Sequence, residues 1–153
     1  MILGKIMTNY QERKSIIQDL QTKRNSTILT YFNLTDRPNG FGTIIADDAI
    51  RPLHSLLEPI GEKDKIELFL HTRGGNLIAA YNMVKIIREY TKNFNVIIPF
   101  RAYSAGSFIA LGADNIVMTK LGQLGPVDPS TPHIFNPVIN PAGNLSDITN
   151  NRK

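Results

Sequence analysis

The chain has 153 residues, 42% of them hydrophobic and 20% charged, and a formal net charge of +4, which excludes a disordered or fibrous protein and predicts one globular domain with a buried core. The absence of cysteine excludes a disulfide framework, a thiolate nucleophile and a cysteine-ligated metal site. Lysine and arginine are scattered and no apolar run approaches the roughly 18 residues of a membrane span, so we expect a cytoplasmic protein that binds no nucleic acid and has no membrane span.

The first part of the chain predicts a helix, a strand and a second helix. Residues 10–24 are rich in helix formers, and the β-branched and aromatic residues of 26–34 predict a strand followed by a loop. Asp47 or Asp48 is expected to cap the second helix, and Gly61 is expected to end it. The buried side of that helix is expected to carry Ile50, Leu53, Leu56 and Leu57.

Strands and helices then alternate up to residue 119. Buried strands are predicted at 65–72 and 95–100, a further helix begins at Ser104, and residues 115–119 return to a strand. The helix between the first two of these strands has its apolar residues at Leu77, Tyr81, Val84 and Ile87. This alternation predicts βαβ units, hence an α/β fold with a mostly parallel sheet and right-handed crossovers.

Composition divides the chain into three parts. We expect an N-terminal helix or arm at 1–25, a repeated β-α core at 26–121, and a proline-rich C-terminal arm at 122–153. In a parallel sheet, functional groups collect where strands end and helices begin. The segments TRGG and YSAG both occupy such a junction, so we expect the functional site there.

Ser104 follows a strand and begins a helix, which is the local setting of a nucleophile elbow, although the G-x-S-x-G spelling is not met. A serine nucleophile needs a base for its proton and N–H donors for the oxyanion of the tetrahedral intermediate. The N–H of Ala105 is a candidate donor at the helix start, and the small residues Ala105 and Gly106 would let a substrate backbone approach closely. A simple helix cap is the alternative role of Ser104, and Ser107 is the alternative nucleophile.

The second donor is expected at Gly74 and Gly75, after the strand at 65–72. A glycine can adopt φ > 0 and turn its N–H toward a ligand without a Cβ in the way. Loss of one oxyanion donor raises a reaction barrier by roughly 3 kcal/mol in mutagenesis, so such a pair is a large catalytic contribution. A tight turn without function is the alternative.

Three segments together, TRGGNL, AYSAGSFIALGADNIVM and LGQLGPVDPS, resemble the serine dehydrogenase proteinase family of the ClpP/crotonase superfamily, which also holds signal peptide peptidase A. The resemblance covers roughly residues 10–130. It implies a ClpP/crotonase-type fold and a serine peptidase that cleaves peptides or proteins, needs no cofactor and assembles as a homo-oligomer. It also implies that Ser104 is the nucleophile, that the Gly75 and Ala105 N–H groups form the oxyanion hole, and that Gly74 and Gly106 contact substrate.

The general base is where the sequence departs from ClpP, because no histidine occupies the expected place. Asp128 resembles the Asp of the family's Gly-Pro-Ile-Asp-Pro block and is the candidate base, although an Asp between Val127 and Pro129 is also a common turn former. His133 and Lys120 are further candidates, Lys120 by analogy with the lysine base of signal peptide peptidases. In a further reading of the resemblance, the base is a lysine that lies further along in the longer chains of the family.

Two other functions are compatible with the same residues. A crotonase-type enzyme would use the two N–H donors on an acyl thioester, and an inactive ClpP-like oligomer would serve as a scaffold or binding module. His54 and His71 are expected to be structural, and no His, Asp and Glu cluster has metal-ligand spacing.

Overall fold

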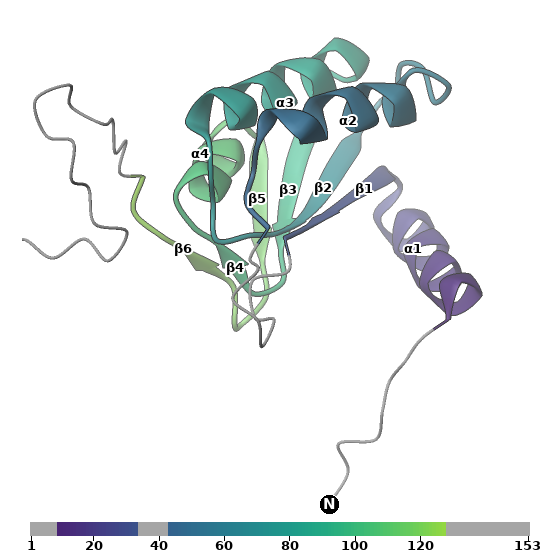
Figure 1. The fold of residues 1–153 in the computed structure, drawn as a ribbon. Helices are drawn as coiled ribbons and strands as arrows, with labels where there is room; N and C mark the ends of the chain where they lie inside the picture. The colour runs from purple at the N-terminus through teal and green to yellow at the C-terminus, as the bar shows by residue number, and fades with distance from the viewer. Residues whose placement is uncertain (1–8, 34–42, 128–153) are drawn as a thin grey trace, which may run out of the picture.

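The computed structural model describes residues 9–33 and 43–127 (Figure 1). A parallel sheet of four strands has the order β1-β2-β3-β5. A second, two-stranded parallel sheet pairs β4 with β6. The strands are β1 (Thr27–Phe32), β2 (Ile66–His71), β3 (Phe94–Ile98), β4 (Arg101–Ala102), β5 (Asn115–Met118) and β6 (Gln123–Leu124).

Helices connect the strands of the main sheet and lie together on one of its faces. They are α2 (Ile50–Leu57) with a short 3-10 helix η1 (Asp47–Ala49) before it, α3 (Leu77–Tyr90) and α4 (Ala105–Leu111). Figure 1 shows α2, α3 and α4 over this face, as right-handed crossovers between successive neighbouring strands require. The predicted α/β class with a parallel sheet is therefore confirmed.

The core lies between these helices and the covered face of the sheet. Leu29, Leu68 and Val96 are neighbours across β1, β2 and β3, and all are buried. Ala79, Ala80 and Met83 of α3 pack into the same cluster. Burial of apolar area at roughly 25 cal/mol per Å² makes this layer the main stabilising contact of the fold.

The N-terminal helix α1 (Tyr10–Arg24) has the predicted bounds, and no residue of it is buried. A capping box begins it, in which the Asn9 side chain accepts from the Glu12 N–H at 2.9 Å and Glu12 accepts from the Asn9 N–H at 3.0 Å. At its end, Arg24 donates to both carboxylate oxygens of the fully buried Glu67 in β2, at 2.6 and 2.7 Å. This ion pair attaches α1 to the sheet.

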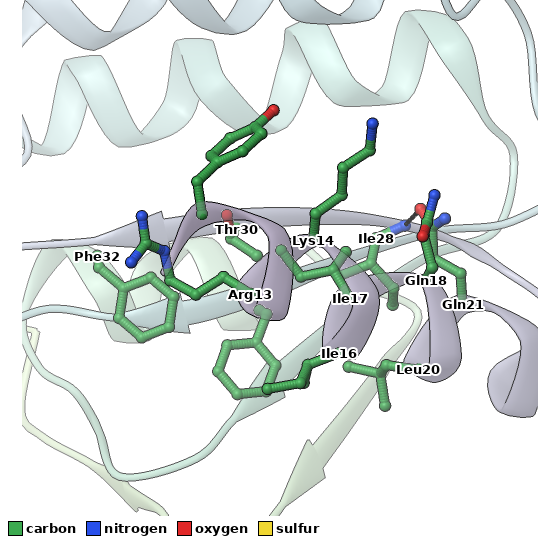
Figure 2. Close-up of a pocket in the computed structure, with 12 residues that line it drawn as sticks. Arg13, Lys14, Ile16, Ile17, Gln18, Leu20, Gln21, Ile28, Thr30 and Phe32 are labelled. Atoms are coloured by element: carbon green, nitrogen blue, oxygen red, sulfur yellow. Dashed lines mark hydrogen bonds between the residues drawn. The ribbon is translucent and has the colours of Figure 1, made fainter. Parts of the chain in front are cut away.

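An open groove of about 640 Å³ lies between α1 and the uncovered face of the sheet at β1 and β2. Figure 2 shows Ile16, Ile17 and Leu20 of α1 along this groove together with Ile28 and Thr30 of β1. Its walls are mostly apolar.

Three details of the predicted helices were wrong. Neither Asp47 nor Asp48 is the N-cap of α2, because the chain enters α2 through η1, and the residues before η1 and α2 are alanines without a capping side chain. Leu56 is 60% exposed, and the buried residues of α2 are Leu53 and Leu57. Tyr81 is 52% exposed, whereas Ile87 of the same predicted apolar set is buried together with Ala79, Ala80 and Met83.

The two-stranded sheet was not predicted. β6 lies in the stretch that we assigned to the proline-rich arm, so the first residues of that stretch pair with the core through β4. The division of the chain near residues 25 and 121 stays a prediction, and most of the expected arm lies outside the described residues.

Candidate active site

The two predicted corners lie next to each other and are hydrogen bonded through Thr72. The corner after β2 runs from Thr72 to Gly75, and the corner after β3 and β4 runs from Tyr103 to Ala105. The Thr72 N–H donates to the Arg101 carbonyl at 2.9 Å, and the Tyr103 N–H donates to the Thr72 carbonyl at 3.2 Å. These bonds extend the parallel pairing of the sheet past the strand ends and bring the two corners together.

Gly74 lies directly against Ser104. A Cβ placed on Gly74 would be 2.7 Å from the Ser104 Cβ and 3.2 Å from the Ala105 nitrogen. Gly74 also has φ +109°, a conformation that side chains rarely adopt. Only glycine fits this position, both by conformation and by space.

Ser104 is held in a strained conformation, and it occupies the N-cap position of α4 without a capping side-chain hydrogen bond. Its φ is +50° and its ψ is −117°, and its side chain makes no cap hydrogen bond to the first turn of α4. A non-glycine residue at such φ and ψ costs on the order of 1–3 kcal/mol and persists only where the surrounding structure imposes it. The role of a simple cap is therefore wrong, and the half-buried hydroxyl is available for another role.

Each of the two corners carries one main-chain donor without a protein acceptor in the described part of the chain. Among the residues that the structure describes, the N–H groups of Gly75 and Ala105 donate to no other protein group. The neighbouring N–H groups are bonded inward, since Gly74 donates to Thr72 Oγ1 at 2.9 Å and Gly106 donates to the Tyr103 carbonyl at 2.8 Å. Each corner thus combines one N–H bonded within the protein with one that is open.

Ile45 fixes the other side of the glycine corner. Its N–H donates to the Gly74 carbonyl at 2.8 Å, and its carbonyl accepts from the Asn76 N–H at 2.8 Å. A Cβ on Gly75 would lie 2.2 Å from the Ile45 carbonyl oxygen. The glycine pair is therefore enclosed between Ile45 and Ser104, and the part played by Ile45 had no signal in the sequence.

Asn76 begins α3 directly after this corner. Its side chain accepts from the N–H groups of Ile78 and Ala79 at 2.7 and 3.0 Å. This cap holds the start of α3 and with it the position of the glycine pair.

Gly106 is buried, and the space of its missing side chain is occupied by Thr72. A Cβ at Gly106 would be 2.4 Å from the Thr72 methyl carbon. Close packing against Thr72 therefore explains why residue 106 is a glycine. Its expected contact with substrate stays a prediction.

Ser107 has a structural environment that differs from that of Ser104. It is 3% exposed, its Oγ lies 2.7 Å from the carbonyl oxygens of both Ala102 and Gly125, and it accepts from the Gly125 N–H at 3.0 Å. Its hydroxyl therefore binds the segment after β6 to the start of α4. The nearby Tyr103 packs against Gly125 and donates a hydrogen bond to the Gln123 side chain.

The candidate bases are not brought to Ser104 within the described residues. Asp128 and His133 lie outside the described ranges. Lys120 is exposed after β5. His54 is exposed beside Tyr90, and the His71 ring stacks on Phe32 and Phe100, so the ring contacts of both lie with aromatic side chains and not with Ser104.

The described ranges hold no group of three or more His, Asp or Glu side chains placed to bind a metal ion. Likewise, within those ranges no helix combines the length and the apolar character that crossing a bilayer requires. The groove beside α1 contains no residue of the two corners.

Comparison with known proteins adds three findings. The sequence profile of the family described as ClpP-like SDH-type serine proteinase matches residues 2–142. One uncharacterized protein of Methanocaldococcus jannaschii is 37% identical over 123 residues, which cover 76% of this chain and 42% of that protein. A second uncharacterized protein of the same organism is 31% identical over 136 residues, which cover 84% and 46%. The chain spans less than half the length of these curated relatives.

Among solved structures, a candidate enoyl-CoA hydratase from Streptomyces coelicolor A3(2) matches with 20% identity and a TM-score of 0.41, over 63% of this chain and 44% of that one. A likeness at this level says nothing about what this chain does. The family profile, in contrast, covers most of the chain and confirms the resemblance that the motifs predicted. The chain therefore belongs to the family of ClpP-like SDH-type serine proteinases.

Proposed function

We propose that this protein hydrolyses peptide bonds with Ser104 as nucleophile. Ser104 Oγ attacks the carbonyl carbon of the substrate while its proton passes to the general base, and the carbonyl oxygen becomes an oxyanion that accepts from the Gly75 and Ala105 N–H groups. The C–N bond then breaks, the amine leaves with a proton, and water hydrolyses the remaining ester to release the acid and regenerate Ser104. Gly74, which lies against Ser104, and Gly106, in the first turn of α4, are the residues proposed to contact the substrate.

One observation carries the proposal. Ser104 is held at positive φ without capping its helix, and it lies against a glycine corner while one open N–H remains in each of the two segments. Strained backbone at such a junction is typical of functional sites. Removal of one preorganised oxyanion donor slows an enzymatic reaction by about 100-fold or more.

We propose Asp128 as the general base. It follows Gly125 by three residues, and Gly125 contacts both Ser107 and Tyr103 beside the start of α4. His133 and Lys120 are the alternatives. Asp128→Asn keeps the shape and removes the carboxylate, so it is expected to slow hydrolysis, whereas His133→Gln and Lys120→Met are expected to leave the rate unchanged.

We further propose a cytoplasmic homo-oligomer that acts on peptides or proteins. The exposed apolar side chains on the outer surfaces of α3 and α4, including Ile78 and Leu111 at 69% exposure each, support an interface between subunits. Sedimentation of the purified chain tests this part, and a monomer at all concentrations would reject it.

The experiment for the central proposal is labelling with a fluorophosphonate. Ser104 Oγ bonds to phosphorus, the P–F bond breaks, and fluoride leaves while the hydroxyl proton passes to the base. Ser104→Ala is expected to abolish both this labelling and casein hydrolysis while the thermal midpoint stays close to that of the wild type. Equal labelling of Ser104→Ala and wild type would reject Ser104, and a folded wild-type chain without labelling or turnover would favour a binding or scaffold role.

A further inference from the structure

Thr72 is a buried polar residue at the point where the two corners meet. Its exposure is 0%, and its backbone binds the Arg101 carbonyl and the Tyr103 N–H on one side. Its side chain faces the glycine corner and the end of β1 on the other. A buried hydroxyl is costly unless it is bonded, so its partners show what it holds in place.

The Thr72 hydroxyl has two acceptors within reach, and Asn33 Oδ1 at 2.6 Å is much closer than the Gly74 carbonyl oxygen at 3.4 Å. It donates to Asn33 Oδ1 at 2.6 Å, and Asn33 itself is 4% exposed. A hydroxyl has one hydrogen, so donation to Asn33 leaves the oxygen lone pairs to accept the Gly74 N–H at 2.9 Å. Asn33 in turn is fixed at the end of β1, where its N–H donates to the His71 carbonyl at 2.9 Å.

The hydrogen-bonded relay of Asn33, Thr72 Oγ1 and the Gly74 N–H determines which N–H of the glycine pair is left without a protein acceptor in the part of the chain that the structure describes. Thr72 binds the Gly74 N–H inward, and the chain then continues through φ values of +109° at Gly74 and +147° at Gly75. The next N–H, that of Gly75, has no acceptor among the described residues. We infer that Thr72, oriented by Asn33, is a positioning residue that aims the Gly75 N–H at the oxyanion, an inference that rests on the proposed function.

The two groups on the Thr72 Cβ have separable contacts. The hydroxyl binds Asn33 and Gly74, whereas the methyl fills the space beside Gly106. Thr72→Ser therefore keeps the relay and removes the packing, and Thr72→Val keeps the packing and removes the relay. A merely structural threonine would be replaced better by valine, and a positioning threonine better by serine.

Thr91 offers a matched control away from the site. It is 6% exposed and accepts the N–H of Asn93, two residues later, at 3.1 Å, as Thr72 accepts that of Gly74. Thr91→Val therefore removes the same kind of local bond in another buried threonine. Its effect measures the general cost of this substitution.

The test compares fluorophosphonate labelling rates of the four chains, resolved into the limiting rate and the half-saturating probe concentration. Thr72→Val is expected to lower the limiting rate by about 100-fold with little change in half-saturation, because a misaimed donor weakens the transition state more than probe binding. Thr72→Ser and Thr91→Val are expected to label at the wild-type limiting rate. A Thr72→Val rate equal to that of Thr91→Val, or a Thr72→Ser rate as low as that of Thr72→Val, would overturn the inference.

A second readout keeps the two proposals distinguishable. The Gly74 amide proton of Thr72→Val is expected to shift and to exchange faster with solvent in NMR, whereas Thr72→Ser keeps the wild-type signal. If the wild type does not label at all, the peptidase proposal fails, and an unchanged Gly74 signal in Thr72→Val would independently overturn the relay. If Thr72→Val does not fold, Asn33→Ala takes its place in the test, because Asn33→Ala removes the acceptor that orients the Thr72 hydroxyl. A wild-type limiting rate of labelling in Asn33→Ala would then contradict the inference.

Discussion

Gly74 and Ser104, which are 30 positions apart in the sequence, lie so close that a Cβ on the glycine would be 2.7 Å from the Cβ of the serine. Real Cβ atoms do not approach each other this closely. The contact means that the two corners have no spare room between them. The position of Ser104 therefore depends on the absence of a side chain at residue 74.

Gly74→Ala is expected to displace Ser104 and to reduce fluorophosphonate labelling by about 100-fold, the cost of losing one aligned oxyanion donor. It is also expected to lower stability, because alanine at this positive φ is strained by about 1–2 kcal/mol before any clash is counted. Labelling kinetics and thermal denaturation of the same preparation measure the two effects.

Gly61→Ala is the matched control for this substitution. Gly61 has φ +67°, yet nothing lies within 4 Å of where its Cβ would be. It should lose about 1 kcal/mol of stability from the positive φ alone and keep the wild-type labelling rate. If both alanine variants label equally fast, the close contact between Gly74 and Ser104 does not matter for reactivity.

Gly106→Ala is expected to be rescued by a second substitution. The new Cβ would lie 2.4 Å from the Thr72 methyl carbon, and its next contact is the Ala102 Cβ at an acceptable 3.4 Å. Thr72→Ser removes that methyl, so the double variant should regain most of the stability that Gly106→Ala loses. Thermal melts of the two single variants and the double variant form a mutant cycle, and strict additivity would show that the two residues are not coupled.

Ser107→Ala tests which serine reacts. Ser107 Oγ is engaged with Ala102 and Gly125, so its removal should cost about 1–3 kcal/mol by leaving buried main-chain groups unpaired. Labelling at Ser104 should still be detected by peptide mass spectrometry in this variant. An adduct found on Ser107 in the wild type would reverse the assignment of the nucleophile.

The ion pair between Arg24 and Glu67 predicts a dependence of stability on pH. Burial raises the pKa of Glu67, but hydrogen bonds from Arg24 and Ser26 outweigh burial, so the pKa is lowered from its ordinary value of 4.5. The stability from this carboxylate is therefore fully present above pH 4.5 and is lost as pH falls through the lower folded-state pKa.

Arg24→Met should cost about 3 kcal/mol at pH 7, because it leaves a buried carboxylate without its main partner. The same change raises the folded-state pKa of Glu67, so the loss of stability on acidification becomes smaller than in the wild type. Urea denaturation at a series of pH values measures both effects. Lys23→Met on the exposed side of α1 is the control, and an equal acid response in all three chains would contradict this role of Glu67.

The arrangement of the core was predictable because it follows from periodicity and strand order. The bounds of α1, the strand at β2 and the two corners all have strong local signals, and parallel strands place their carboxyl ends at one edge of the sheet. The closeness of Gly74 and Ser104 therefore agrees with what the sequence predicted. The chemical roles of the site residues stay predictions.

Other features depend on tertiary contacts that leave no local signal. A serine at this junction normally caps its helix with its side chain, whereas Ser104 has a positive φ, makes no such cap bond and lies against Gly74. Asp114, in the turn after α4, accepts the Phe94 N–H at 2.8 Å and pairs with Arg88 at 3.0 Å, contacts that its place in the sequence does not indicate. The hydrogen bonds from Arg88 are the main cause of the lowered pKa of Asp114.

The most direct measurement of the central claim is a crystal structure of the fluorophosphonate-treated protein. The account predicts a phosphonyl group on Ser104 Oγ, with one phosphonyl oxygen about 2.7–3.1 Å from both the Gly75 and the Ala105 nitrogens. An adduct on another residue, or a phosphonyl oxygen that contacts neither nitrogen, would contradict it.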